Sequence, residues 1–180
     1  MRTPFPKYWL TAALLSVAMA ACAVVDTRSG VVSADVSSDK VSVHLVNPDQ
    51  FTEIRQNRNY GDVRDGSWLV DLQKYVVKQA GLRLAPGQHL DVNITDIKRA
   101  GDFEPWRGPS FADIRVVKEI YPPRIELNYV LKDGNGKTIH EGSSELTDLA
   151  FMRRIVRDGS DPLRFEKRLI DDWLAKVLPS

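Results

Sequence analysis

Apolar and polar residues alternate in several stretches of the chain, with the period of a β-strand that buries one face. These stretches are residues 41–46, 89–97 and 112–120, followed by the longer segment 121–149. Inside this last segment, residues 133–136 are Asp, Gly, Asn and Gly, which tolerate the backbone angles of a tight turn. Residues 121–149 are therefore predicted to form a β-hairpin around which the rest of the sheet is built.

Two further stretches have the period of an amphipathic helix. Residues 67–81 place apolar side chains three and four positions apart, and residues 162–177 carry an apolar stripe from Phe165 to Val177. The polar segment 47–66 is predicted to be a long loop held down by Phe51 and Ile54. The predicted fold is α+β: a two-layer sandwich with an antiparallel sheet of about five strands and two long helices packed on one face.

The first 21 residues have the features of a secretory signal peptide. Arg2 and Lys7 precede an apolar run at residues 8–21, which is shorter than the roughly 20 residues needed to cross a bilayer. We therefore expect residues 1–21 to be removed on export, residues 22–40 to form a tether, and residues 41–178 to form one domain.

Cys22 is the only cysteine of the chain, so it has no partner for an internal disulfide. The sequence MAAC at residues 19–22 resembles a bacterial lipobox, with Met19 where Leu is usual, and this implies cleavage before Cys22 and lipidation of its thiol. Cleavage after Ala20 is the alternative, because Ala18 and Ala20 satisfy the rule for ordinary signal peptidase. Ala23 follows Cys22 in place of Asp, which favours the outer membrane.

Length and charge narrow the remaining possibilities. The 180 residues suit a single domain, and 25 basic against 24 acidic residues give no strongly basic surface. We therefore expect no nucleic acid as a partner.

The loop 100–111 and the residues after it hold the candidate partner-binding residues. Exposed Trp and Arg on irregular loops are common anchors of protein interfaces. The predicted set is Phe103, Trp106, Arg107, Tyr121 and Arg124. The alternative is that the aromatic rings cover an open end of the core.

The sequence contains no recognisable catalytic motif, and no cofactor or metal site is predicted. His44, His89 and His140 are isolated from one another in sequence. Carboxylates on strands and turns could form an acid/base pair if the fold brought them together, which keeps a periplasmic hydrolase or a small-ligand-binding protein as the alternative. These carboxylates are Asp91, Asp96, Glu145 and Asp148.

Six blocks of sequence, in order along the chain, resemble the domain of unknown function 3016 family of exported bacterial proteins. They are VNPDQFTEI at 46–54, TDIKRAG at 95–101, EPWRGP at 104–109, YPPRIELNYVLKDGNGK at 121–137, LTDLAFM at 146–152 and RFEKRLIDDWL at 164–174. The resemblance implies export, often as a lipoprotein, and assigns no activity.

Taken together, these features predict a non-enzymatic lipoprotein of the cell envelope, a binding or assembly-accessory module. It is expected to face the periplasm from the outer membrane through lipidated Cys22 and to bind another envelope protein. A soluble periplasmic or secreted protein is the alternative that follows from cleavage after Ala20.

Overall fold

The computed structural model describes residues 35–154 and 159–178, so the predicted signal peptide and Cys22 lie outside the described residues. Five strands form the main sheet in the order β1-β2-β3-β6-β7. They are β1 Val36–Ser37, β2 Val41–Leu45, β3 His89–Lys98, β6 Arg124–Lys132 and β7 Thr138–Thr147. The short strand β1 lies within the segment predicted as a tether.

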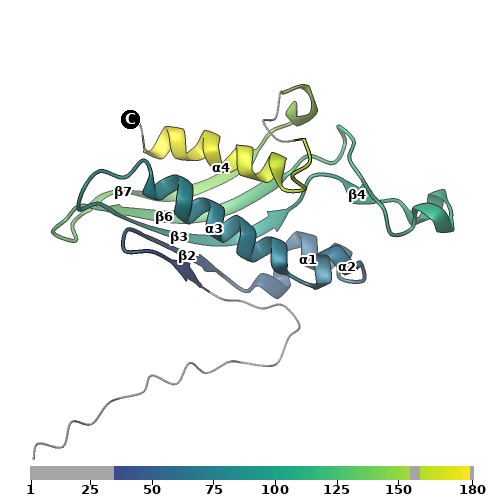
Figure 1. Ribbon diagram of the computed structural model, residues 1–180, viewed down its shortest axis with the longest axis horizontal. Helices are drawn as coiled ribbons and strands as arrows, with labels where there is room; N and C mark the ends of the chain where they lie inside the picture. Colours follow the sequence, from purple (N-terminus) through teal and green to yellow (C-terminus); the bar gives the residue numbers. More distant parts are fainter. Residues whose placement is uncertain (1–34, 155–158, 179–180) are drawn as a thin grey trace, which may run out of the picture.

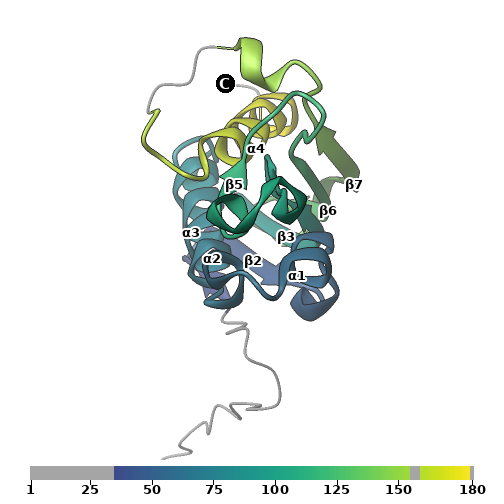
Figure 2. The ribbon, with the colours of Figure 1, turned by 90° about the vertical axis from the view of Figure 1, so that its right-hand side faces the viewer.

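The two long helices, α3 Ser67–Gly81 and α4 Arg164–Val177, lie side by side over one face of the sheet (Figures 1 and 2). Their apolar stripes pack against alternate residues of β2, β3 and β6, as the sequence pattern predicted. Leu72 and Leu174 are almost fully buried, and each such side chain contributes about 1.5–3 kcal/mol. The α+β class, with two long helices, is therefore confirmed.

The prediction of an antiparallel sheet is wrong, because the sheet is mixed. Strand β2 pairs with β3 in parallel, with Val43 opposite Val92, whereas the other neighbours in this sheet are antiparallel. The connection between β2 and β3 contains α3, which packs on the sheet and returns the chain to the end of the sheet at which β2 begins. A crossover of this kind makes neighbouring strands parallel, whereas a connection that turns back at the same end of the sheet makes them antiparallel.

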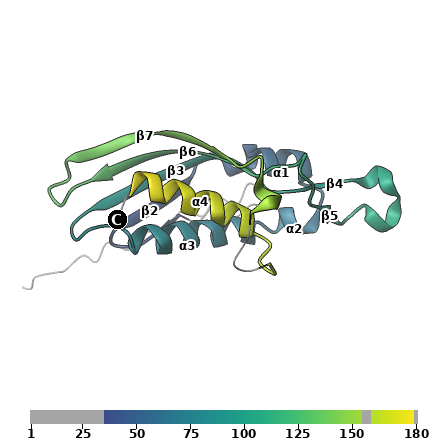
Figure 3. The same ribbon diagram turned by 90° about the horizontal axis from the view of Figure 1, so that it is seen from above.

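The segment predicted as a long loop, residues 47–66, is largely helical. It contains the 3-10 helix η1 Pro48–Gln50 and the short helices α1 Thr52–Asn57 and α2 Gly61–Arg64. Phe51 and Ile54 do pack into the core, as expected. Helices α1 and α2 lie at the end of the sheet from which residues 100–121 project (Figure 3).

Residues 112–120 do not form a strand of the main sheet, which corrects another prediction. Only β5 Arg115–Val116 is extended, and it pairs with β4 Asp102–Phe103 in a separate two-stranded ribbon. Ile114 and Ile120 are 52% and 71% exposed, so the alternating pattern did not mark a buried face.

Candidate functional site

Residues 100–121 leave the body as a projecting arm between β3 and β6 (Figure 3). The arm contains β4, β5 and two 3-10 helices, η2 Pro105–Arg107 and η3 Pro109–Phe111. Each of these short helices begins with a proline, whose fixed φ angle restricts the tip. Gly101 has φ of 80°, and a Cβ there would lie 2.8 Å from the carbonyl oxygen of Val116, so the two legs approach too closely for a larger residue.

The root of the arm is held by Glu53 of α1, whose side chain is fully buried. Its carboxylate accepts hydrogen bonds from Lys98 Nζ at 3.1 Å, from the backbone N–H of Arg99 at 3.0 Å and from the guanidinium of Arg115. Burial by itself raises the pKa of Glu53, but the charges of Arg115 and Lys98 and these hydrogen bonds outweigh it and hold the pKa below its usual range. Glu53 thus joins the end of β3 to the returning leg of the arm.

An aromatic stack reinforces the same root. The ring of Phe103 lies 3.6 Å from that of Tyr60, centroid to centroid and nearly parallel. The Arg115 guanidinium lies over the Phe103 ring, 4.7 Å from its centroid, where a cation–π interaction is favourable. Asp62 of α2 pairs with Arg99 at 3.1 Å and with Arg115 at 3.5 Å. Residues from three separate stretches therefore fix where the arm leaves the body.

A second buried carboxyl, Glu166 of α4, accepts the backbone N–H of Ala100 at 2.6 Å. Burial raises the pKa of Glu166 above its usual value. Its other oxygen, Oε2, is buried and has no hydrogen-bond partner among the residues that the structure describes. The outgoing leg of the arm is thus attached to the helix layer by a buried carboxyl.

Further out, Glu104 ties the two legs together. Its carboxylate accepts hydrogen bonds from Lys118 Nζ at 2.6 and 2.8 Å and from the hydroxyl of Tyr121 at 3.1 Å. The bond from Lys118 is the main reason that the pKa of Glu104 lies below its usual value. The pKa of Tyr121 is raised, first by burial and next by the hydrogen bond to Glu104.

The tip of the arm exposes a Trp. The side chain of Trp106 is 73% exposed, and Phe111 beside it is 40% exposed. Arg107 lies over the Phe111 ring, 4.8 Å from its centroid, and its guanidinium also reaches Glu104 at 3.4 Å. The tip thus presents an indole next to a cation on an aromatic ring.

The structure divides the predicted partner-binding set. Trp106 and Arg107 lie together at the tip, whereas Phe103 is 5% exposed in the root and Tyr121 binds Glu104 between the legs. Arg124 lies on β6, where it donates to Asp96 at 3.0 Å. Of the two interpretations of the aromatic residues, covering the core fits Phe103 and an exposed anchor fits Trp106.

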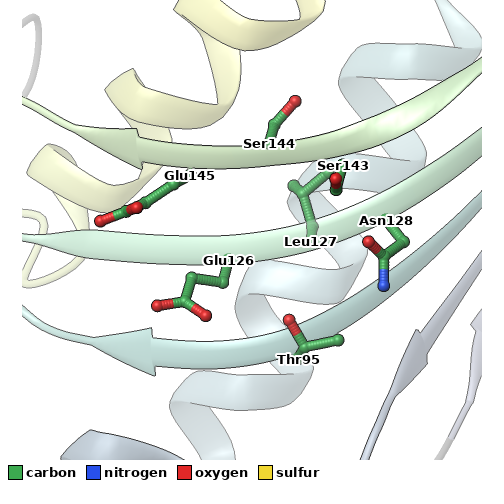
Figure 4. Close-up of a pocket in the computed structure, with 7 residues that line it drawn as sticks. All are labelled: Thr95, Glu126, Leu127, Asn128, Ser143, Ser144 and Glu145. Atoms are coloured by element: carbon green, nitrogen blue, oxygen red, sulfur yellow. The ribbon is translucent and has the colours of Figure 1, made fainter.

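The face of the sheet opposite α3 and α4, here called the open face, is polar. A shallow depression of about 270 Å³ lies on it, between β3, β6 and β7, and its lining residues are drawn in Figure 4. Glu126 and Glu145 are directly opposite each other in the register of β6 and β7. The depression is lined by Thr95, Glu126, Leu127, Asn128, Ser143, Ser144 and Glu145.

Of the carboxylates considered for acid/base chemistry, Asp96 and Glu145 lie in one row of the sheet, two strands apart on either side of Glu126, whereas Asp91 and Asp148 lie elsewhere. Asp91 is bound by Lys132 at 2.7 Å and by His89 at 3.0 Å, and Asp96 is bound by Thr52 and Arg124. Asp91 and Asp96 are five residues apart on one strand, about 16 Å along it. Asp148 pairs with Arg154 near α4.

The histidines are also separate. His44 pairs with Asp35 at 3.0 Å, His89 with Asp91, and the Nδ1 of His140 lies 2.9 Å from the hydroxyl of Tyr129. Within residues 35–154 and 159–178 no three His, Cys, Asp or Glu side chains are arranged to hold a metal ion.

Sequence reasoning missed Glu53, Glu166 and Glu104. Glu166 had a detectable signal, because it lies four and seven positions before Ile170 and Trp173 on the buried stripe of α4. Glu53 lies in a polar stretch, TEIRQN, whose composition does not distinguish a buried acid from an exposed one.

None of the helices in the described part of the chain is long and apolar enough to span a bilayer. Comparison of the sequence and structure with known proteins found no significant match among curated proteins or among solved structures. Residues 39–176 match the family described as a protein of unknown function, DUF3016, and the chain therefore belongs to that family.

Proposed function

We propose that this protein is a non-enzymatic lipoprotein of the cell envelope, anchored through Cys22, that binds another envelope protein with the tip of its arm. The observation that carries the proposal is the exposure of Trp106, at 73%, on the end of a projection whose root is firmly fixed. A large aromatic ring left in solvent on a rigid projection is suited to a pocket on a partner.

The energy available from this contact supports a specific complex. Burying roughly 150 Å² of apolar indole surface contributes about 3–4 kcal/mol before the costs of association. Arg107 adds a charged group whose side chain is already positioned against Phe111. Because the prolines and the Glu53 cluster restrict the arm beforehand, little ordering cost remains to be met on binding.

The alternative, a periplasmic hydrolase, would need paired carboxylates beside a substrate. Asp91, Asp96 and Asp148 are each bound to a basic side chain, and Glu145, opposite Glu126 of β6, lines only a shallow depression on the exposed face of the sheet. This arrangement favours a binding role over an enzymatic one.

Site-specific photo-cross-linking in cells tests the proposed contact. A cross-linking residue at Trp106 is expected to capture one envelope protein in constant proportion. The matched control is Leu149, which is 75% exposed but lies outside the arm. Equal yields from both positions, or none from Trp106, would refute the proposal.

The anchor is tested separately by mass spectrometry of the mature protein. The wild type is expected to carry acyl chains on Cys22, and Cys22→Ser is expected to be released without detergent, because two or more acyl chains are needed for stable anchoring. A mature wild-type chain that begins at Ala21 and carries no lipid would contradict the anchor.

A further inference from the structure

We propose that the outer edge of β7 pairs with an extended, basic segment of a partner protein, adding a sixth strand to the main sheet. The strand runs from Thr138 to Thr147 at one edge of the sheet, and in the described residues it pairs with β6 alone. Figure 3 shows it along one long side of the molecule. This surface is distinct from the tip of the arm.

The edge lacks several of the features that prevent strand addition. Short edge strands, prolines and covering loops normally block such edges. Strand β7 is ten residues long and contains no proline, and most of its residues are exposed. Its ladder to β6 is irregular only near its start, between Leu131 and Lys132, so Glu141–Thr147 offers a regular row of backbone donors and acceptors.

Charge on the open face determines which segment fits. The two basic residues of β6 on this face pair with acids of β3 and β6: Lys132 binds Asp91 at 2.7 Å, and Arg124 binds Asp96 at 3.0 Å and Glu126 at 3.5 Å. Glu141 and Glu145 of β7 have no ion-pair partner among the described residues. The outer edge of β7 therefore combines two acidic side chains with a row of backbone groups that pair with no strand among the described residues.

The depression of Figure 4 continues this acidic strip inward from β7 across β6 to β3, on the side of β7 away from an added strand. Glu145, Ser143 and Asn128 line it from β7 and β6. An added strand would lie about 4.8 Å from β7. At that spacing, a lysine or arginine of the added strand that points to the open face could reach Glu145. Because side chains alternate, such a segment would carry basic residues at every second position.

A second copy of this chain is a poorer occupant. Two β7 strands paired about a two-fold axis would bring Glu141 and Glu145 of one copy near those of the other, and like charges across strands destabilise a sheet. A basic segment removes this repulsion, so we assign the edge to a partner of opposite charge.

The test uses a fluorescein-labelled octapeptide of alternating lysine and threonine, titrated with the purified protein and followed by fluorescence anisotropy. Two further versions carry N-methyl groups on alternate residues, one version for each edge of the peptide. Strand pairing uses only one edge of the peptide, so one N-methylated version is expected to bind at least about tenfold more weakly and the other to bind like the parent.

Variants of the protein test the charge. Glu145→Lys is expected to weaken binding of the octapeptide about tenfold. Asp71→Lys makes the same change of charge on the exposed side of α3 and is expected to leave binding unchanged. Trp106→Ala is also expected to leave it unchanged, which separates this surface from the arm.

Several outcomes would overturn the assignment. Equal binding of both N-methylated peptides, or equal loss in the two charge variants, would reduce the interaction to non-specific attraction. Absence of saturable binding would exclude a basic strand. A concentration-dependent dimer in sedimentation experiments that the octapeptide dissociates would assign the edge to a second copy instead.

Discussion

Replacing Glu53 by Gln should destabilise the protein more than any change at an exposed acid. The amide keeps a similar shape and an acceptor for the backbone N–H of Arg99, but it removes the negative charge between Lys98 and Arg115. The side chains of these two cations are only 14% and 13% exposed, so water compensates little of the loss.

The expected loss is about 3 kcal/mol in the free energy of unfolding at pH 7, the lower end for breaking a buried ion pair, because Asp62 and Asp102 remain nearby. For a domain of this size each kcal/mol lowers the Tm by about 2–4 °C, so the shift should be about 6–12 °C. Chemical unfolding followed by circular dichroism measures the first quantity, and calorimetry measures the second.

The pH dependence provides an independent check. Because the pKa of Glu53 is lowered in the folded state, its stabilisation is present above the unfolded value of about 4.5 and is lost as the pH falls through the folded value. The difference between wild type and Glu53→Gln should therefore be constant near pH 7 and shrink below pH 4.5.

Asp71→Asn is the control for this experiment, since Asp71 is exposed on α3. It should change the unfolding free energy by less than about 0.5 kcal/mol. If Glu53→Gln changed stability as little as this control, or if its effect grew as the pH fell, the account of the arm root would be wrong. Hydrogen exchange should also show faster exchange at residues 101–118 in Glu53→Gln.

Three further predictions concern the arm. Gly101→Ala should lower the free energy of unfolding by about 2–3 kcal/mol, because φ is positive there and the new Cβ would lie 2.8 Å from the carbonyl oxygen of Val116. Chemical unfolding measures this, and an unchanged stability would show that the two legs can separate freely. Because the pKa of Glu166 is raised in the folded state, the wild type should lose stability as the pH rises above the unfolded value. The unfolding free energy of Glu166→Gln relative to wild type should therefore increase from pH 4 to pH 8. Equal pH dependence in the two proteins would contradict the raised pKa. Phe103→Ala should lower the free energy of unfolding by about 3–5 kcal/mol, whereas Trp106→Ala should leave it almost unchanged. Similar losses of stability in the two variants would place Trp106 in the core.

The sequence predicted those elements whose apolar residues face the core. The helix at 67–81 and the hairpin around 133–136 are confirmed, because α3 and β6 each bury one face and the residues at 133–136 form the expected turn. The parallel pairing of β2 and β3 was not predicted, since strand direction depends on how α3 returns the chain and not on either strand.

The error at residues 112–120 has a different cause, which is that periodicity does not report exposure. Residues 112–120 alternate like a strand, yet Ile114 and Ile120 lie in the solvent-exposed arm. The candidate site was predicted only as far as Trp106 and Arg107. The anchoring residue Glu53 could not be found, because its partners Lys98 and Arg115 are distant in sequence and only the fold brings them together.

The arm also bears on how the family can diversify. Strands β3 and β6 are neighbours that pair up to Lys98 and Arg124, so residues 100–121 occupy the position of a hairpin turn. A turn can change in length and content at little entropic cost, provided that its two ends remain fixed. Replacement of the tip should therefore leave the sheet and its helices intact, which makes this scaffold suitable for grafting new recognition segments.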